Sequence, residues 1–189
     1  MRKLVSVIGD AVIEKDGDKF KAAFATGKAL VDHGYRVQSG GMGGVMEAAF
    51  MGARASEKYR EGDTVALVPS FDANEANKYA DIVIPTGLDM MRNALVANAS
   101  AVIAVGGGAG TLSEMALAWS LKRLIIAFRN VDGWSGKLAD TRLDHRIRYP
   151  FEDKVFGVNT AEEAMAILNE KIDLFNEYHK GIRLLDLNG

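Results

Sequence analysis

The sequence predicts an α/β fold of one domain, in which a parallel sheet is covered by helices on both faces in three Rossmann-like layers. Short β-branched runs alternate along the chain with longer segments of helical period. The short runs are mostly apolar, as strands are when helices cover both faces of their sheet. A chain of 189 residues, 48% of them hydrophobic, can bury one sizeable core. We therefore expect a single domain over residues 1–189.

Six of the apolar runs are expected to be strands. They cover residues 4–8, 36–39, 64–68, 82–84, 101–105 and 124–128. Helices are expected at residues 18–33, 45–59, 90–98, 111–121 and 161–178. The glycines in residues 132–136 are expected to break regular structure, and the alternating charges of residues 140–148 to form a solvated face. The tail after residue 181 is expected to be peripheral.

Charge and composition exclude several classes of function. The formal net charge is -2, from 23 basic and 25 acidic residues, so no global positive field would attract a nucleic-acid polymer or a membrane surface. Cysteine is absent, which excludes disulfides and cysteine-based metal sites and fits a reducing compartment. His33, His145 and His179 have no metal-binding spacing, so no metal site is predicted. The apolar run at residues 4–8 is too short for a signal peptide or a membrane span, and we expect a cytoplasmic location.

Two glycine-rich turns each follow a predicted strand and lead into a predicted helix. Residues 40–44 read Gly-Gly-Met-Gly-Gly, and residues 106–110 read Gly-Gly-Gly-Ala-Gly. A helix N-terminus offers unpaired N–H groups and a partial positive charge, so a phosphate gains hydrogen bonds and dipole stabilisation there. The carboxyl ends of parallel strands can bring both turns to one crevice. The candidate ligand-binding residues are Gly40, Gly41, Gly43, Gly44, Met46, Gly107, Gly108, Gly110 and Thr111.

Glycines in such turns can also serve only to let the backbone turn tightly. The occurrence of two clusters in the same strand-to-helix context favours ligand binding over that alternative. Neither cluster completes the dinucleotide-binding motif, and no P-loop lysine follows either of them. NAD binding and ATP hydrolysis are therefore not predicted. We expect no resident cofactor, and a small phosphorylated ligand as the partner.

Arg92 and the segment from Ala101 to Glu114 are similar to the signature of the Lonely Guy (LOG)-like family, once described as lysine decarboxylase-like. That signature is an arginine upstream of proline-glycine-glycine-x-glycine-threonine-x-x-glutamate, and residues 40–46 resemble the family's other glycine-rich turn. The resemblance covers residues 36–119 and implies a Rossmann-like nucleotide-binding domain that forms a homodimer or a higher homo-oligomer. The family includes phosphoribohydrolases, which cleave the N-glycosidic bond of nucleoside 5′-monophosphates. It also includes non-catalytic carriers of the molybdenum cofactor.

Several positions depart from the hydrolase pattern. Gly106 stands where the hydrolases have proline, Asn93 where they have lysine, and Glu47 where they usually have glycine. Residues 77–79, 85–87 and 92–93 resemble the carrier-like, uncharacterised branch of the family. The resemblance thus implies a protein that binds a nucleoside monophosphate or a molybdopterin-like ligand, and it leaves both hydrolysis and carriage open.

Arg92 and Glu114 are the candidate catalytic residues, because both match the hydrolase pattern. Glu114 lies three residues after Thr111, which is the spacing of a helix capping box and would be a purely structural role. Its predicted helix carries two apolar stripes, so we expect a subunit interface near it and a buried carboxylate that needs a partner or a ligand. In a hydrolase, Glu114 would stabilise a positively charged ribosyl transition state or activate water.

Arg92 is expected in the first turn of its helix, with Asp89 as the N-cap. A cation there opposes the helix dipole, and an anionic ligand or a buried carboxylate would relieve that cost. The alternative is a solvated surface arginine. In a hydrolase, Arg92 would hold the phosphate or assist the departing base.

Overall fold

Seven parallel strands form the sheet of the described residues, 1–178, in the order β4-β3-β2-β1-β5-β6-β7. The structure is a computed structural model. Its strands are β1 (Leu4–Gly9), β2 (Arg36–Ser39), β3 (Thr64–Val68), β4 (Ile82–Pro85), β5 (Ala101–Val105), β6 (Leu124–Phe128) and β7 (Val155–Val158). Every neighbouring pair is parallel. The predicted parallel sheet is therefore confirmed.

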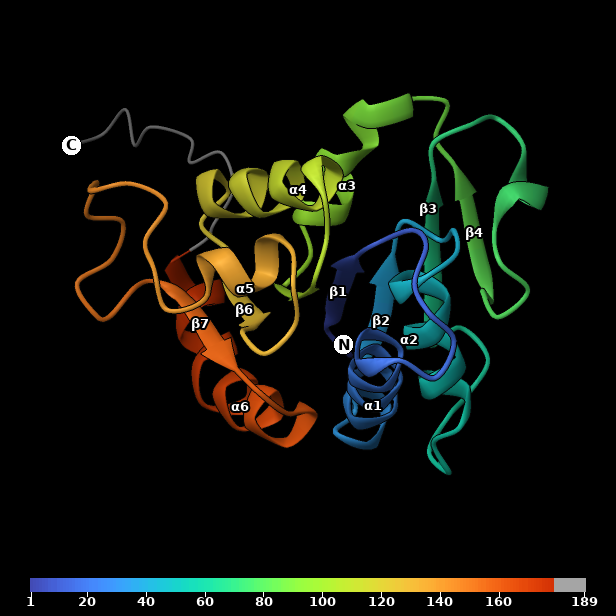
Figure 1. Cartoon of the computed structure of the whole chain (residues 1–189), viewed down its shortest axis with the longest axis horizontal. Helices are drawn as coiled ribbons and strands as arrows, with labels where there is room; N and C mark the ends of the chain where they lie inside the picture. Colours follow the sequence, from blue (N-terminus) through green and yellow to red (C-terminus); the bar gives the residue numbers. More distant parts are fainter. Residues whose placement is uncertain (179–189) are drawn as a thin grey trace, which may run out of the picture.

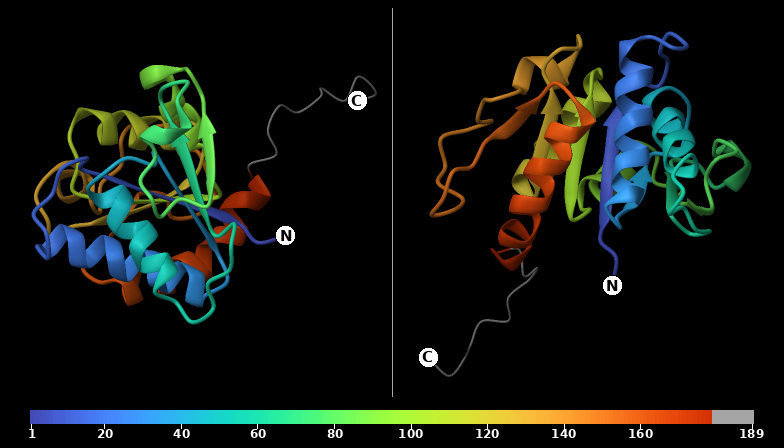
Figure 2. Two further views of the ribbon diagram at one scale, coloured as in Figure 1. Left: turned by 90° about the vertical axis from the view of Figure 1, so that its right-hand side faces the viewer. Right: turned by 90° about the horizontal axis from the view of Figure 1, so that it is seen from below.

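Helices cover both faces of this sheet (Figure 1). One face carries α1 (Asp18–Asp32), α2 (Val45–Arg54) and α6 (Ala161–Tyr178). The other carries α3 (Asn93–Ala97), α4 (Ala109–Ser120) and α5 (Trp134–Leu138). Two short 3-10 helices, η1 (Ala73–Glu75) and η2 (Asp89–Arg92), precede β4 and α3. Seen from below, α1, α2 and α6 lie side by side in front of the strands (Figure 2), so the predicted three-layer α/β architecture is confirmed.

Alternate residues of β5 pack into opposite helix layers, which is why this strand is apolar throughout. Ala101, Ile103 and Val105 belong to the core cluster that also contains α1, α2 and α6 side chains. Val102 and Ala104 belong to the second cluster, with side chains of α3 and α4. The two cores hold β5 rigidly, and with it the glycine turn that follows.

The sheet has a topological switch point at β1, which pairs with β2 on one side and with β5 on the other. In open α/β sheets, ligands bind in the crevice outside the carboxyl ends of the strands at such a point. The order β2-β1-β5 places the turn after β1 between the two glycine-rich turns. The fold thus brings three turns to one edge of the sheet.

Several elements differ from the sequence prediction. The helix predicted for residues 45–59 ends at Arg54, because the Ser56 hydroxyl donates to Asp32 and accepts from the Lys58 N–H, a local turn that competes with the helix. The helix predicted for residues 90–98 is divided into η2 and α3. Strand β7 was not predicted, because Gly157 interrupts its apolar run. The break in regular structure predicted for residues 132–136 is wrong from Trp134 onward, where α5 begins. The tail after residue 181 lies outside the described residues.

The predicted solvated face at residues 140–148 is wrong for Arg148. Only 6% of its side chain is exposed, and it forms an ion pair with Asp153. Its guanidinium carbon lies 3.4 Å from the ring centroid of Trp119, so it stacks on α4. In the described part of the chain, no helix is long and apolar enough to cross a bilayer.

Candidate functional site at the carboxyl edge of the sheet

The turn after β5 enters α4 through two glycines with left-handed backbone. Gly106 has φ 68° and Gly107 has φ 100°, a region that residues with a side chain rarely adopt. A Cβ at Gly107 would also collide with the side chain of Thr111, which is buried. The backbone of the turn therefore requires these two glycines.

Gly108 and Gly110 are glycines for which the fold gives no packing reason. Both are exposed, and apart from the adjoining residues and the backbone of α4 itself, no atom of the described residues lies within 4 Å of the place where a Cβ would stand at either. Neither has a left-handed backbone. The first N–H groups of a helix lack acceptors within the helix, and no side chain caps this end of α4. The N-terminus of α4 is thus an open surface of backbone donors, which suits an anionic group.

The first glycine turn, residues 40–44, is packed against the rest of the chain. The groups that a Cβ would meet are the Arg92 guanidinium at Gly40, Ala66 at Gly41 and the Asp10 carbonyl at Gly44. Gly41 and Gly44 also have positive φ, 77° and 67°. Close packing and backbone conformation therefore account for glycine at these three positions.

Asn77 fastens this first turn from the β3–β4 connection. Its backbone N–H donates to the Gly41 carbonyl at 2.8 Å, and its side-chain amide donates to the carbonyls of Gly41 and Met42 at 3.0 and 2.9 Å. At Gly43 a Cβ would stand 3.1 Å from the carbonyl of Ala11. Met46 is 7% exposed. The turn is therefore held in one conformation at the carboxyl edge of the sheet, where it borders the candidate site.

Arg92 and Glu114 form a buried ion pair between η2 and α4. Arg92 Nη1 donates to Glu114 Oε1 at 3.1 Å, and the two residues are 9% and 7% exposed. Burial raises the pKa of Glu114 to about 7, against the opposing effect of the Arg92 charge. Arg92 Nε is buried with no hydrogen-bond partner among residues 1–178. Because Arg92 also lies against Gly40, the pair links the two glycine turns.

This geometry tests the structural alternatives that were left open for the two residues, and not their catalytic role. The surface interpretation of Arg92 is wrong, and the buried carboxylate with a partner is confirmed. The capping box is wrong, because α4 begins at Ala109 with Gly108 as N-cap, which puts Glu114 beyond the first turn. Asp89 is not a helix N-cap either, since it begins η2 after Leu88.

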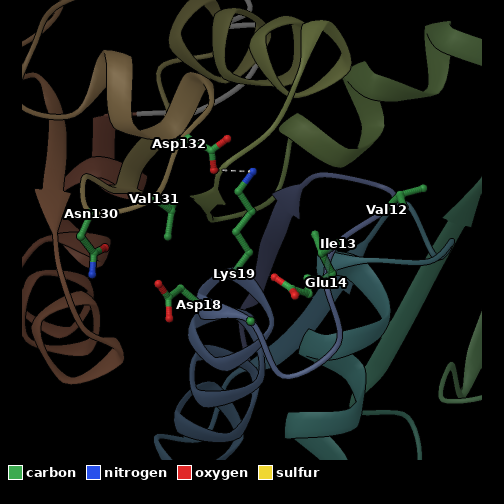
Figure 3. Close-up of a pocket in the computed structure, with 9 residues that line it drawn as sticks. Val12, Ile13, Glu14, Asp18, Lys19, Asn130, Val131 and Asp132 are labelled. Atoms are coloured by element: carbon green, nitrogen blue, oxygen red, sulfur yellow. Dashed lines mark ion pairs between the residues drawn. The ribbon is translucent and has the colours of Figure 1, made fainter.

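Asp10 is a site residue that the sequence analysis missed. It follows β1, and its Oδ2 accepts from the N–H of Gly107 at 2.8 Å and from Nζ of Lys19 at 2.7 Å. Lys19 also pairs with Asp132 at 2.9 Å, across a cavity of about 380 Å³ (Figure 3). Only its position in the sequence could have pointed to Asp10. It is an acidic residue directly after the first strand of an α/β sheet, next to a switch point.

Ser135 holds the second glycine turn from the other side. Its hydroxyl accepts from the Gly106 N–H at 2.7 Å and donates to the Phe128 carbonyl at 2.8 Å. The Trp134 N–H donates to the Gly107 carbonyl at 2.9 Å. The turn is therefore preorganised by its neighbours before any ligand arrives. The described residues contain no cluster of three or more metal-binding side chains.

The chain is similar to a protein family, to a relative in sequence and to several solved structures. The model of the SLOG cluster4 family matches residues 2–165. An uncharacterised protein of Archaeoglobus fulgidus is 37% identical over 115 residues, which are 60% of this chain and 72% of that protein. Among solved structures, the molybdenum cofactor binding protein of Rippkaea orientalis has a TM-score of 0.74 and 26% identity over 91% of this chain and 98% of that one. The molybdenum cofactor carrier protein of Chlamydomonas reinhardtii has a TM-score of 0.73 and 26% identity over 89% and 98%.

Proposed function

Because the chain belongs to the SLOG cluster4 family, a LOG-like family, we propose that it binds a small phosphorylated ligand with its anionic group on the N-terminus of α4. The observation that carries this proposal is the open space at Gly108 and Gly110. Every other glycine of the two turns has a packing or backbone reason, and these two have none. They keep the helix N-terminus accessible to a group as large as a phosphate. In this proposal Gly107 and Thr111 line the bottom of the binding site.

The ligand we favour is a phosphorylated cofactor of the molybdopterin class, which the protein would carry without chemical change. The two solved proteins described above bind or carry the molybdenum cofactor, and this chain aligns with nearly their whole length. The departures from the hydrolase pattern at Gly106 and Asn93 agree with carriage. The buried Arg92–Glu114 pair would then be a structural link between the glycine turns.

Nucleoside 5′-monophosphate hydrolysis is the second candidate, and one observation favours it. A carboxyl group whose pKa is near 7 can take or give a proton at neutral pH, as Glu114 would have to. Incubation with AMP would then release adenine and ribose 5-phosphate. Glu114→Gln would abolish most of that release in a folded protein. If the protein is a carrier, the wild type should release no free base from any nucleoside monophosphate.

We also propose that a second copy of the chain packs on the outer side of α4. An apolar groove of about 440 Å³ lies there, lined by Met90, Met91, Ala94, Ser113, Ala116, Leu117 and Ser120. Met90 and Met91 are 64% and 75% exposed, which is unusual for large apolar side chains at adjacent positions. A homodimer that forms through this groove would bury the second apolar stripe of α4.

Calorimetry with inorganic phosphate and AMP tests the binding site. We expect the wild type to bind, and Gly110→Val to lose most of that affinity, because the added side chain would cover the helix N-terminus. Ala166→Val is the matched control, since Ala166 is exposed in the middle of α6, far along the chain from the site. Equal affinity in folded wild type and Gly110→Val would place the anion elsewhere.

A further inference from the structure

The Asp10 carboxylate already binds the glycine turn that the proposed ligand would use. Asp10 Oδ2 accepts from the Gly107 N–H at 2.8 Å. A Cβ at Gly106 would stand only 2.5 Å from the same oxygen, so glycine at 106 leaves room for this carboxylate. An anion carried by the protein therefore lies beside the first N–H groups of α4.

Lys19 balances this carboxylate from the first turn of α1. Its Nζ lies 2.7 Å from Asp10 Oδ2 and 2.9 Å from Asp132 Oδ1, and 22% of its side chain is exposed. A cation in the first turn of a helix is opposed by the helix dipole, so its two carboxylate partners offset that cost. Burial would lower the pKa of Lys19, but the contacts with Asp10 and Asp132 raise it above its ordinary value. Lys19 is therefore charged at neutral pH.

The positions of these groups join the two halves of the sheet. Asp10 follows β1, Lys19 is the second residue of α1, and Asp132 belongs to the turn after β6. Figure 3 shows Lys19 extending from α1 across the cavity to Asp132. Lys19 thus connects the turn after β1 with the turn after β6. Its ammonium group can exchange one oxyanion partner for another without leaving the site.

We propose that Asp10 is an internal substitute for the anionic group of the ligand, and that Lys19 transfers from Asp10 to that group when the ligand binds. This inference rests on the proposed function, since it assigns the residues that set the affinity of the same site. Like charges this close repel, so Asp10 opposes the binding of an anion and Lys19 favours it. The balance of the two sets the affinity: free phosphate binds, but more weakly than it would without Asp10, and other parts of a larger ligand contribute further binding energy.

Calorimetry with inorganic phosphate and with AMP tests this inference on the full-length protein. Asp10→Asn should raise the affinity for both probes by about tenfold or more, because the repulsion is removed. The amide oxygen of asparagine can still accept from the Gly107 N–H, so the turn is kept. Lys19→Met should lower the affinity by a similar factor. Near-ultraviolet circular dichroism checks that each variant is folded.

Asp18→Asn is the matched control for loss of charge. Asp18 lines the same cavity and begins α1, but in the described part of the chain no hydrogen bond or ion pair joins it to the glycine turn. Its substitution should change the phosphate affinity much less than Asp10→Asn does. An equal gain in both variants would mean that net charge, and not the contact with Gly107, sets the affinity, and would overturn the inference.

The remaining outcomes separate this inference from the proposed function. If the wild type binds phosphate or AMP, Gly110→Val abolishes binding, and Asp10→Asn binds no more tightly, then the site stands and the role of Asp10 is wrong. Weaker binding by Asp10→Asn would also overturn that role, since it would make Asp10 a direct ligand contact. If neither the wild type nor Asp10→Asn binds any phosphate probe, both proposals fail.

Discussion

The guanidinium of Arg92 and the carboxylate of Glu114 lie 3.1 Å apart in a place where both side chains are almost fully buried. Arg92 reaches this position because glycine at 40 leaves space for it, and Glu114 because α4 begins at Ala109. The pair therefore joins η2, the end of β2 and α4. Removal of one partner from such a pair is strongly destabilising, because the other partner keeps a buried charge that nothing compensates.

Glu114→Ala should lower the free energy of unfolding by about 3 kcal/mol, because Arg92 would keep a buried charge without its acceptor. Glu114→Gln should cost less, since its amide oxygen can still accept from Arg92. Urea denaturation at pH 7 measures both. Glu57→Ala, at an exposed position after α2, is the control for loss of a glutamate. A loss no greater than that of the control would mean that the pair is not closed in solution.

The stability of the protein should fall between about pH 4.5 and pH 7 on account of Glu114. Its pKa is raised in the folded state, to about 7 from 4.5, so the folded state binds more protons than the unfolded state in this range. The contribution is fully present below pH 4.5 and is lost as the pH rises through 7. We expect the difference in unfolding free energy between wild type and Glu114→Gln to decrease by on the order of 2 kcal/mol over this window. Urea titrations at several pH values would give no such trend if Glu114 were normally ionised.

Replacement of two glycines of the second turn with alanine, one at a time, should have opposite effects on stability. Gly107→Ala should lower the free energy of unfolding by about 2 kcal/mol or more, from left-handed backbone strain and the collision with Thr111. Gly110→Ala meets open space inside a helix and should raise it by about 0.5–1 kcal/mol. Thermal and urea unfolding compare the two. Destabilisation by Gly110→Ala would show that this position packs against something in the folded protein.

Met91→Glu should dissociate the proposed homodimer, because it places a charge in the apolar groove beside α4. Light scattering at micromolar concentration should give a dimer or a higher oligomer for the wild type and a smaller species for the variant. Ile147→Glu is the control, because Ile147 is 86% exposed and lies outside this groove. A monomeric wild type would remove the proposal.

The layers of the fold could be predicted from sequence because the strands are apolar on both faces and the helices are long and periodic. β7 was missed because its four residues include Gly157, which interrupts the apolar run. The reason for that glycine is tertiary: a side chain there would collide with Asp140, which pairs with Arg129. No local pattern in the sequence contains this information.

The candidate site was only partly predictable for a similar reason. Burial of Glu114 and its need for a partner followed from the apolar helix, but its spacing from Thr111 fitted a capping box equally well. The actual N-cap, Gly108, has no side chain and so gives no capping signal. Asp10 was missed because its contact with Gly107 joins residues 97 positions apart, and only the order of the strands brings them together.

Native mass spectrometry of the purified protein shows whether it carries a phosphorylated ligand on the N-terminus of α4. We expect a small phosphorus-containing molecule, unchanged on prolonged incubation, on the wild type and on Ala166→Val. We expect Gly110→Val, purified in the same way and equally folded, to have lost it. Retention of the same molecule by Gly110→Val, or recovery of a free base and ribose 5-phosphate in place of an intact ligand, would contradict a carrier that holds its phosphate on the N-terminus of α4.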